Sequence, residues 1–333
     1  MRRTQAQAIE RLEKESIRSI DAITALGAES LARMWQTTRS WLKDAVEEEY
    51  RRDFARSTWN VTDAIRCGTI HRIDQSVAQA LSDFRDASVS FASRTFKEVY
   101  KESVLRSVWI LDQVTPPKVD ARLPQSRMFA EAAGPVYLGP DEDTTWKVRW
   151  SAWMDAYRQS LNNNLKLGAI NESTIDDAID EVDATRPGSP QADLWTAIER
   201  IYDHQAVAVS ANAQRDVANA NQGIGVIEIW QTRYYDRVCD ICDANKGLTR
   251  EEADDVIPAH PNCGCYWRLV PKDWADLLKS GDAEDRELAK TMDAFGEVPS
   301  AMLIYNDAGA LVGSTIVEFE DWAAEKIRAV SGR

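Results

Sequence analysis

The chain has 333 residues, of which 44% are hydrophobic and 28% are charged, and its formal net charge is −14. These proportions are ordinary for a globular protein and exclude a chain that is disordered throughout. The negative charge disfavours nucleic-acid binding as the main activity, because a phosphate backbone repels an acidic surface. No apolar run is long enough for a transmembrane helix, and no apolar segment follows the N-terminal arginines, so we predict neither a membrane span nor a signal peptide.

Residues 1–114 have the composition and periodicity of long amphipathic helices. No proline precedes Pro116, and apolar residues recur at helical spacing. The first of these apolar positions are Ile9, Leu12, Ile17, Ile20, Ile23, Leu26, Leu31, Met34 and Trp35. We expect about two to four helices that form a bundle or an arm, with the apolar stripe in a core rather than in a ligand site.

Prolines interrupt this helical pattern over residues 115–145, which predicts a linker or an arm that lies on a partner. Helical spacing returns with Trp146, Trp150 and Trp153, and we expect these three side chains on one buried helix face.

Two more helices are expected before the next change of pattern. Ser173 with Asp176 resembles a capping box for a helix that extends to Val182. After Arg186-Pro-Gly-Ser-Pro190, an alanine-rich helix continues to about Asn221.

The pattern changes to strands after Gly223. Residues 226–232 and 266–270 read as two strands that flank a cysteine cluster, and a short acidic helix (283–295), a hairpin (301–305 with 311–319) and a terminal helix (320–330) follow. The predicted fold class is mainly α, with long N-terminal helices, a second helical region and a small α+β module. The predicted domains are a helical bundle or arm (1–114), a linker or arm (115–145), a core with the Cys/His cluster (146–272) and a helix–hairpin–helix tail (273–333).

Four of the five cysteines lie close together, as Cys239-x-x-Cys242 and Cys263-x-Cys265, and His260 precedes Cys263 by three residues. Zinc in structural sites takes four thiolate or imidazole ligands, and a C-x2-C turn can present two sulfurs to one ion. We therefore predict a structural zinc site that ties the ends of the two strands together. Cys239 and Cys242 are the firmer ligands, and the others come from His260, Cys263 and Cys265.

Other interpretations of this cluster stay open. The thiols could pack without metal or form a disulfide, and His260 could orient the turn between Pro258 and Pro261 or donate a hydrogen bond to a ligand. A redox C-x-x-C is disfavoured, because the pair is not expected to open a helix after a strand. A site filled by protein ligands is structural, and the sequence contains no H-E-x-x-H, P-loop or G-x-S-x-G motif, so we expect no enzyme and assign no catalytic or cofactor-binding residue.

The cluster in its setting resembles the phage Mu F-like head morphogenesis family of minor capsid proteins. The resemblance rests on the helix over 206–221, the strand through Trp230, Cys239-x-x-Cys242, Gly247 and the segment Pro258-Ala-His-Pro-Asn-Cys-Gly-Cys265, and it covers roughly residues 145–272. Gly264 stands where the family usually has arginine, and Ala213-Gln214 stands where its helix commonly has a Thr-Glu pair.

The resemblance implies a phage minor head structural protein at the head interior or portal vertex, which assists head assembly or DNA packaging and ejection. Its implied partners are the portal protein and other head proteins, a contact with packaged DNA stays open, and no membrane is involved. The implied location is the virion, with the host cytoplasm during assembly. The alternative is a zinc-dependent nuclease or a toxin-type effector that uses the Cys/His cluster, with His260 as its only candidate catalytic residue.

Overall fold

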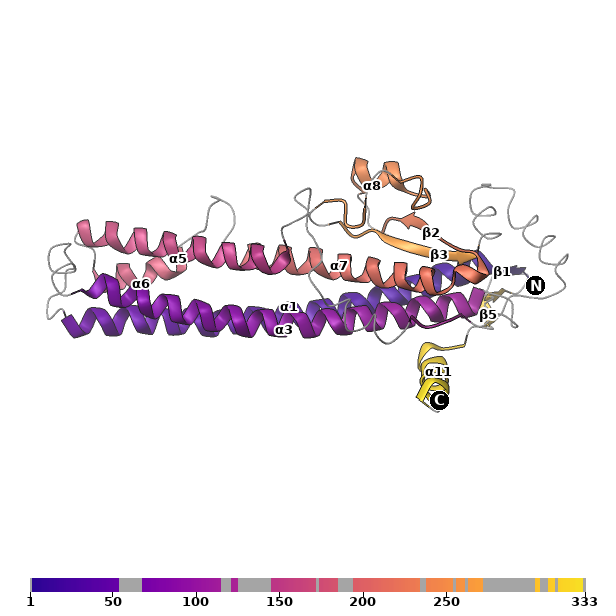
Figure 1. The fold of residues 1–333 in the computed structure, drawn as a ribbon, viewed down its shortest axis with the longest axis horizontal. Helices are drawn as coiled ribbons and strands as arrows, with labels where there is room; N and C mark the ends of the chain where they lie inside the picture. The colour runs from indigo at the N-terminus through magenta and orange to yellow at the C-terminus, as the bar shows by residue number, and fades with distance from the viewer. Residues whose placement is uncertain are drawn as a thin grey trace. The chain divides into compact units, whose positions relative to one another are not determined.

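The computed structural model describes twelve stretches of the chain. Within them the chain forms seven α-helices, one 3₁₀ helix and two small antiparallel sheets, which confirms the predicted mainly α fold class (Figure 1). No helix in these ranges is long and apolar enough to cross a membrane. The described residues are 2–53, 68–114, 121–124, 145–171, 174–184, 194–233, 238–253, 256–260, 263–271, 303–305, 311–314 and 317–331.

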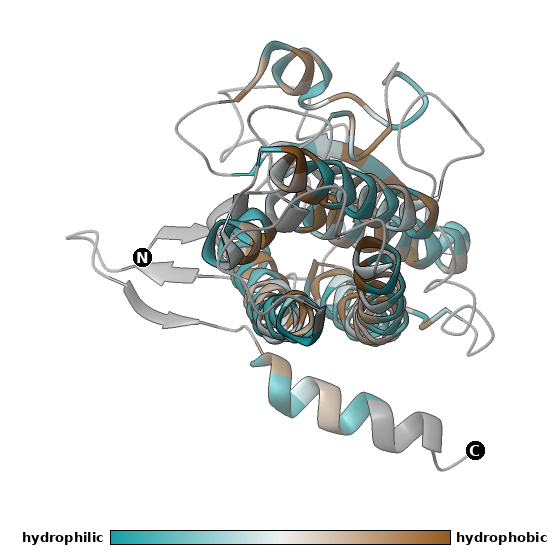
Figure 2. Ribbon diagram, turned by 90° about the vertical axis from the view of Figure 1, so that its left-hand side faces the viewer, coloured by the Kyte–Doolittle hydropathy of each residue, from teal (hydrophilic) through white to brown (hydrophobic). Residues whose placement is uncertain are grey.

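The structure confirms the helices that the spacing of apolar residues predicts. Two long helices occupy most of the range 1–114, as expected, with 49 residues in α1 and 46 in α3. The bounds are α1 (Gln5–Asp53), α3 (Thr69–Val114), α5 (Trp146–Ile170), α6 (Ile175–Ala184), α7 (Leu194–Ala220), η1 (Gln222–Ile224), α8 (Asp240–Asn245) and α11 (Phe319–Ser331). Hydrophilic and hydrophobic residues are interspersed along each helix ribbon, as in amphipathic helices (Figure 2).

The strands form two separate antiparallel sheets. The two strands that the sequence predicts on either side of the cysteine cluster are present, and β2 (Val226–Gln231) pairs with β3 (Tyr266–Pro271). β4 (Leu303–Tyr305) and β5 (Leu311–Ser314) form the predicted hairpin. β1 (Arg2–Thr4) adds a third strand to this hairpin. The expectation that the first residues are helical was therefore wrong, because a three-residue strand whose partner lies at the other end of the chain leaves no local pattern.

The chain forms two compact units, which are described separately. Unit 1 consists of Met1–Thr24, Phe96–Gly134 and Ala206–Arg333, and unit 2 consists of Ala25–Thr95 and Pro135–Gln205. Helices α1, α3 and α7 each contribute residues to both units. The division of the sequence into four consecutive domains stays a prediction.

Aromatic side chains form one part of the core of unit 2. The ring of Trp35 packs against those of Phe84 and Tyr157, with centroids 5.3 and 5.4 Å away. The indole N–H of the fully buried Trp150 donates to Ser88 Oγ at 3.1 Å. A buried tryptophan needs such a partner for its N–H, so this hydrogen bond helps to fix α5 against α3.

The predicted buried face of α5 is correct in its first half. Trp146 and Trp150 are fully buried, whereas Trp153 is only half-buried and Met154 continues the buried face. Trp146, Trp150 and Met154 are spaced i, i+4 and i+8, which keeps all three on one side of the helix.

The apolar stripe of α1 is buried at Ile9, Leu12, Ile20, Leu31 and Trp35. Leu26, which was expected in this stripe, is 65% exposed. Its neighbour Gly27 takes the buried position instead, because a Cβ atom there would lie 1.9 Å from Tyr202 Oη. Consecutive helix residues point about 100° apart, and at this position the core-facing residue is Gly27 rather than Leu26.

The capping box of α6 lies one residue later than predicted. Thr174 Oγ1 accepts from the N–H of Asp177 at 3.2 Å, and Asp177 Oδ2 accepts from the N–H of Thr174 at 2.8 Å. The prediction of Ser173 and Asp176 was therefore wrong, because two overlapping Ser/Thr-x-x-Asp frames are present and the sequence pattern does not distinguish them.

In unit 1, polar contacts join the C-terminal parts of α3 and α7 to their surroundings. Tyr100 Oη donates to Asp216 Oδ2 at 2.6 Å, and Ser103 and Ser210 hydroxyls lie 3.0 Å apart. Asn221 makes two hydrogen bonds with the backbone of Arg122, at 2.7 and 2.9 Å. This short described part of the expected 115–145 linker is therefore paired with the end of α7.

Several expectations lie outside the described residues. These are the rest of the linker over 115–144, the start of the helix near Pro190, and the acidic helix over 283–295. The terminal helix is confirmed as α11.

Candidate metal centre

The first two cysteines are positioned by the short helix α8. Cys239 is its N-cap, and its Sγ accepts from the N–H of Cys242 at 3.4 Å. Because this geometry places both sulfurs on one turn, the pair can act as a two-point ligand. The expectation that the pair does not open a helix was wrong, since the spacing alone does not show the cap.

The loop after α8 is held against the edge of β2 by backbone hydrogen bonds. Gly247 has φ +83° and donates to Trp230 O at 2.9 Å. Trp230 N donates to Leu248 O at 2.8 Å, and Arg250 N donates to Glu228 O at 3.0 Å. A positive φ favours glycine, so Gly247 allows the turn that directs the chain back along the strand.

All five predicted ligand residues come together in this module. His260 Nε2 lies 3.0 Å from Cys239 Sγ and 3.1 Å from Cys242 Sγ. Cys242 Sγ lies 3.8 Å from Cys263 Sγ. The donors form two groups that share Cys242, namely Cys239, Cys242 and His260, and Cys242, Cys263 and Cys265, and within each group the atoms lie within 4.8 Å of one another.

One of these separations matches that of two thiolates in a tetrahedral metal site. Zn–S bonds of about 2.3 Å place two sulfurs of a tetrahedron about 3.8 Å apart, which is the separation of Cys242 Sγ and Cys263 Sγ. None of the four cysteines is disulfide-bonded. The Cys/His groups could therefore hold a metal ion.

Burial and hydrogen bonding shift the pKa values of the thiols in different directions. Cys242, Cys263 and Cys265 are buried, whereas Cys239 is exposed. A hydrogen bond from Cys265 lowers the pKa of Cys263, and burial raises the pKa of Cys242. The pKa of Cys265 is raised by its hydrogen bond to Cys263 and by burial. A divalent cation would allow the remaining thiols to ionise, because it compensates the charge that they would otherwise carry together.

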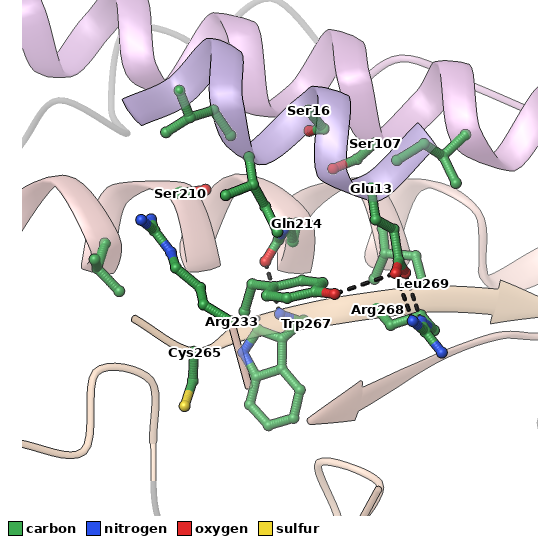
Figure 3. A pocket seen from close by; sticks show the side chains of 15 residues that line it. Glu13, Ser16, Ser107, Ser210, Gln214, Arg233, Cys265, Trp267, Arg268 and Leu269 are labelled. Carbon is green, nitrogen blue, oxygen red and sulfur yellow. Dashed lines mark hydrogen bonds and ion pairs between the residues drawn. The ribbon is translucent and has the colours of Figure 1, made fainter. Parts of the chain in front are cut away.

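Strand β3 connects the cluster to the helices of unit 1. Cys265 and Trp267 point away from the helices, whereas Arg268 is turned toward Glu13 of α1 (Figure 3). The N–H of Trp267 donates to Gln214 Oε1 of α7 at 2.9 Å (Figure 3). The sequence did not indicate Glu13 or Gln214, since neither belongs to a recognisable motif.

A small cavity with both polar and apolar lining residues lies on the helix side of β3. Its volume is about 40 Å³, which is room for a few water molecules and far below that of a typical ligand pocket. Its lining includes Glu13, Ser16, Ser107, Ser210 and Gln214 (Figure 3). Among the described residues, the Cys/His cluster is therefore the stronger candidate for a functional site.

Comparison with known proteins finds no matching family model, no matching curated protein and no matching solved structure. The motif and the geometry of the cluster are therefore the features that bear on function.

Proposed function

We propose that this chain is a minor head structural protein of a tailed phage, located at the head interior or the portal vertex. The observation that carries the proposal is the convergence of Cys239, Cys242, His260, Cys263 and Cys265 between two paired strands. These residues belong to the segment that resembles the head morphogenesis family. The module assists head assembly or the packaging and ejection of DNA.

The metal of this module is zinc, and its role is structural. Thiolate and imidazole donors favour zinc over the hard cations that prefer oxygen. Five protein donors for four positions leave no coordination position that must be filled by water, which distinguishes a structural site from a catalytic one. The bound ion would cross-link the start of α8 to the start of β3, which the chain otherwise connects through a long loop.

Protein partners are favoured over DNA by charge and by architecture. The net charge of −14 opposes extended contact with a phosphate backbone. Helices α1 and α3 present long surfaces on which an oligomeric partner could dock. The proposed partners are therefore the portal protein and other head proteins, and any contact with packaged DNA is local.

A zinc-dependent nuclease or a toxin-type effector is less well supported. His260 Nε2 faces the sulfurs of Cys239 and Cys242, so the same nitrogen cannot serve as a free general base while it binds a metal. The proposal therefore predicts no DNA cleavage by the purified protein with zinc, magnesium or manganese. Cleavage that His260→Ala abolishes would favour the alternative.

Particle composition tests the proposed location. Procapsids and mature virions are purified from cells that produce the phage encoding this chain, and the chain is quantified in both by mass spectrometry. We expect a constant low copy number in at least one particle, and reduced incorporation of the Cys242→Ser variant compared with a Ser90→Ala control on the exposed side of α3. Absence of the wild-type chain from both particles would contradict the proposal.

A further inference from the structure

The two faces of β3 serve two different sites. Side chains alternate across a strand, so residues 265 and 267 lie on one face and residues 266 and 268 on the other. The first face carries Cys265 into the thiol cluster. The second face carries Tyr266 and Arg268 to Glu13 of α1. The metal centre and this helix contact are therefore joined by four consecutive residues.

Glu13 is an unusual residue for its position, because its side chain is only 4% exposed. Nε and Nη2 of Arg268 donate to its two oxygens, which forms a bidentate ion pair. Tyr266 Oη also donates to Glu13 Oε2, at 3.1 Å. Arg268 is itself largely buried, with 17% of its side chain exposed.

A further contact fixes the same strand at its backbone. Gln214 Oε1 of α7 accepts from the N–H of Trp267 at 2.9 Å. Together with the ion pair, this bond fixes the position of β3 along α1 and α7. It also determines which face of the strand points toward these helices. A shift of one residue would turn Arg268 away from Glu13 and Cys265 away from the cluster at the same time.

We infer that Glu13 is a positioning residue of the metal centre, which acts through β3 to hold Cys265 and its neighbours in the geometry that binds the ion. The inference rests on the metal site proposed above. Removal of the Glu13 charge takes the bidentate ion pair away from the largely buried Arg268, which favours a displacement of β3 toward solvent. Such a displacement moves the start of the strand and with it the Cys263-x-Cys265 pair.

The coupling is reciprocal, because both events stabilise the same position of β3. A metal ion that favours the docked strand strengthens the contact with Glu13, and the contact with Glu13 strengthens metal binding by the same factor. We expect a factor of about ten, within the range that is common for coupling between two sites of a protein.

Cobalt and zinc affinities of the full chain test this inference. Cobalt binding is followed by its thiolate charge-transfer and d–d bands, and zinc affinity by competition with a chromophoric chelator. The variants are Glu13→Gln and the double variant Glu13→Met/Arg268→Met, which replaces the ion pair by an apolar contact. Glu10→Gln is the matched control, because Glu10 is a partly exposed acid of the same helix that pairs with Lys14.

We expect the dissociation constant to rise about tenfold in Glu13→Gln, to stay unchanged in Glu10→Gln and to recover in part in the double variant. An unchanged constant in folded Glu13→Gln overturns the inference, even if that variant unfolds at a lower temperature. Should Glu13→Gln not fold, Tyr266→Phe removes one hydrogen bond to Glu13, and an unchanged constant in that variant overturns the inference. A wild-type chain that binds neither ion overturns both the metal site and the coupling, whereas the proposed location in the phage head is decided separately by particle composition.

Discussion

His260 and Cys242 meet in the cluster although they are 18 positions apart in the sequence, with Nε2 of the ring 3.1 Å from Sγ. Cys242 also faces Cys263, and it is the one residue that both donor groups share. This central position distinguishes it from the other thiols, each of which belongs to a single group. It leads to a ranking of the cysteines by their contribution to metal binding.

We predict that Cys242→Ser weakens zinc binding more than Cys265→Ser does. Loss of the shared donor breaks both groups of the cluster, whereas loss of Cys265 leaves the group of Cys239, Cys242 and His260 intact. Competition with a chromophoric chelator measures both constants, with Cys67→Ser as a control outside the cluster sequence. Equal losses in the two cluster variants would show that Cys242 is not the central ligand.

Ser88→Ala is expected to destabilise unit 2 by about 1–3 kcal/mol, because it leaves a buried donor unsatisfied. The buried Ser88 hydroxyl accepts from Trp150 Nε1 at 3.1 Å and donates to Arg85 O at 3.1 Å. Urea unfolding followed by tryptophan fluorescence gives the free energy of unfolding. Ser90→Ala, an exposed serine two residues along α3, should change it by much less. Equal effects of the two substitutions would contradict the importance of this hydrogen bond.

Gly27→Ala is expected to lower the free energy of unfolding by about 1–3 kcal/mol, since overpacking costs more than the gain in helix propensity of about 1 kcal/mol. The new Cβ would lie 1.9 Å from Tyr202 Oη and 2.9 Å from Cζ of the same ring. Thermal and urea unfolding measure the effect. The double variant Gly27→Ala/Tyr202→Phe should recover part of the loss, because it removes the nearer atom. A stabilised single variant would show that the ring moves aside without cost.

Asp74 is expected to make the stability of unit 2 depend on pH. The hydrogen bonds from Arg158, at 2.8 Å to each carboxylate oxygen, lower the pKa of Asp74 below its ordinary value, and Asn162 adds a further hydrogen bond. A lowered folded-state pKa contributes stability above the unfolded pKa of about 3.9, and this contribution is lost as the pH falls through the folded pKa. The difference in unfolding free energy between wild type and Asp74→Asn should therefore be largest near neutral pH and shrink below about pH 4. A difference that stays constant from pH 7 to pH 3, measured by urea unfolding, would contradict this account.

Local patterns were sufficient for most of the helical fold and for the cluster. The absence of proline before Pro116 and the spacing of apolar residues predicted α1 and α3, and the strands on either side of the cluster were predicted from their alternation. The five donors were predicted from spacing alone, because C-x2-C and H-x2-C-x-C place ligands within a few residues of each other.

Contacts between distant segments could not be predicted in this way. Glu13 has the sequence signature of a solvated helix residue, and its burial depends on Arg268, 255 positions later in the chain. The strand β1 depends in the same way on β4. Leu26 was wrongly expected in the core, because the buried position next to it belongs to Gly27. The close approach of Tyr202, from another helix, leaves room there only for glycine.

The metal content of the purified full chain tests the proposed module most directly. Native mass spectrometry of protein prepared without added chelator should show one zinc ion per chain, and Cys242→Ser should show little or none. Strong chelation should also lower the unfolding temperature of the wild type and leave that of Cys242→Ser unchanged, because structural zinc contributes to folding stability. A wild-type chain that carries no metal, and that binds none when zinc is added under reducing conditions, would contradict the proposed structural zinc site.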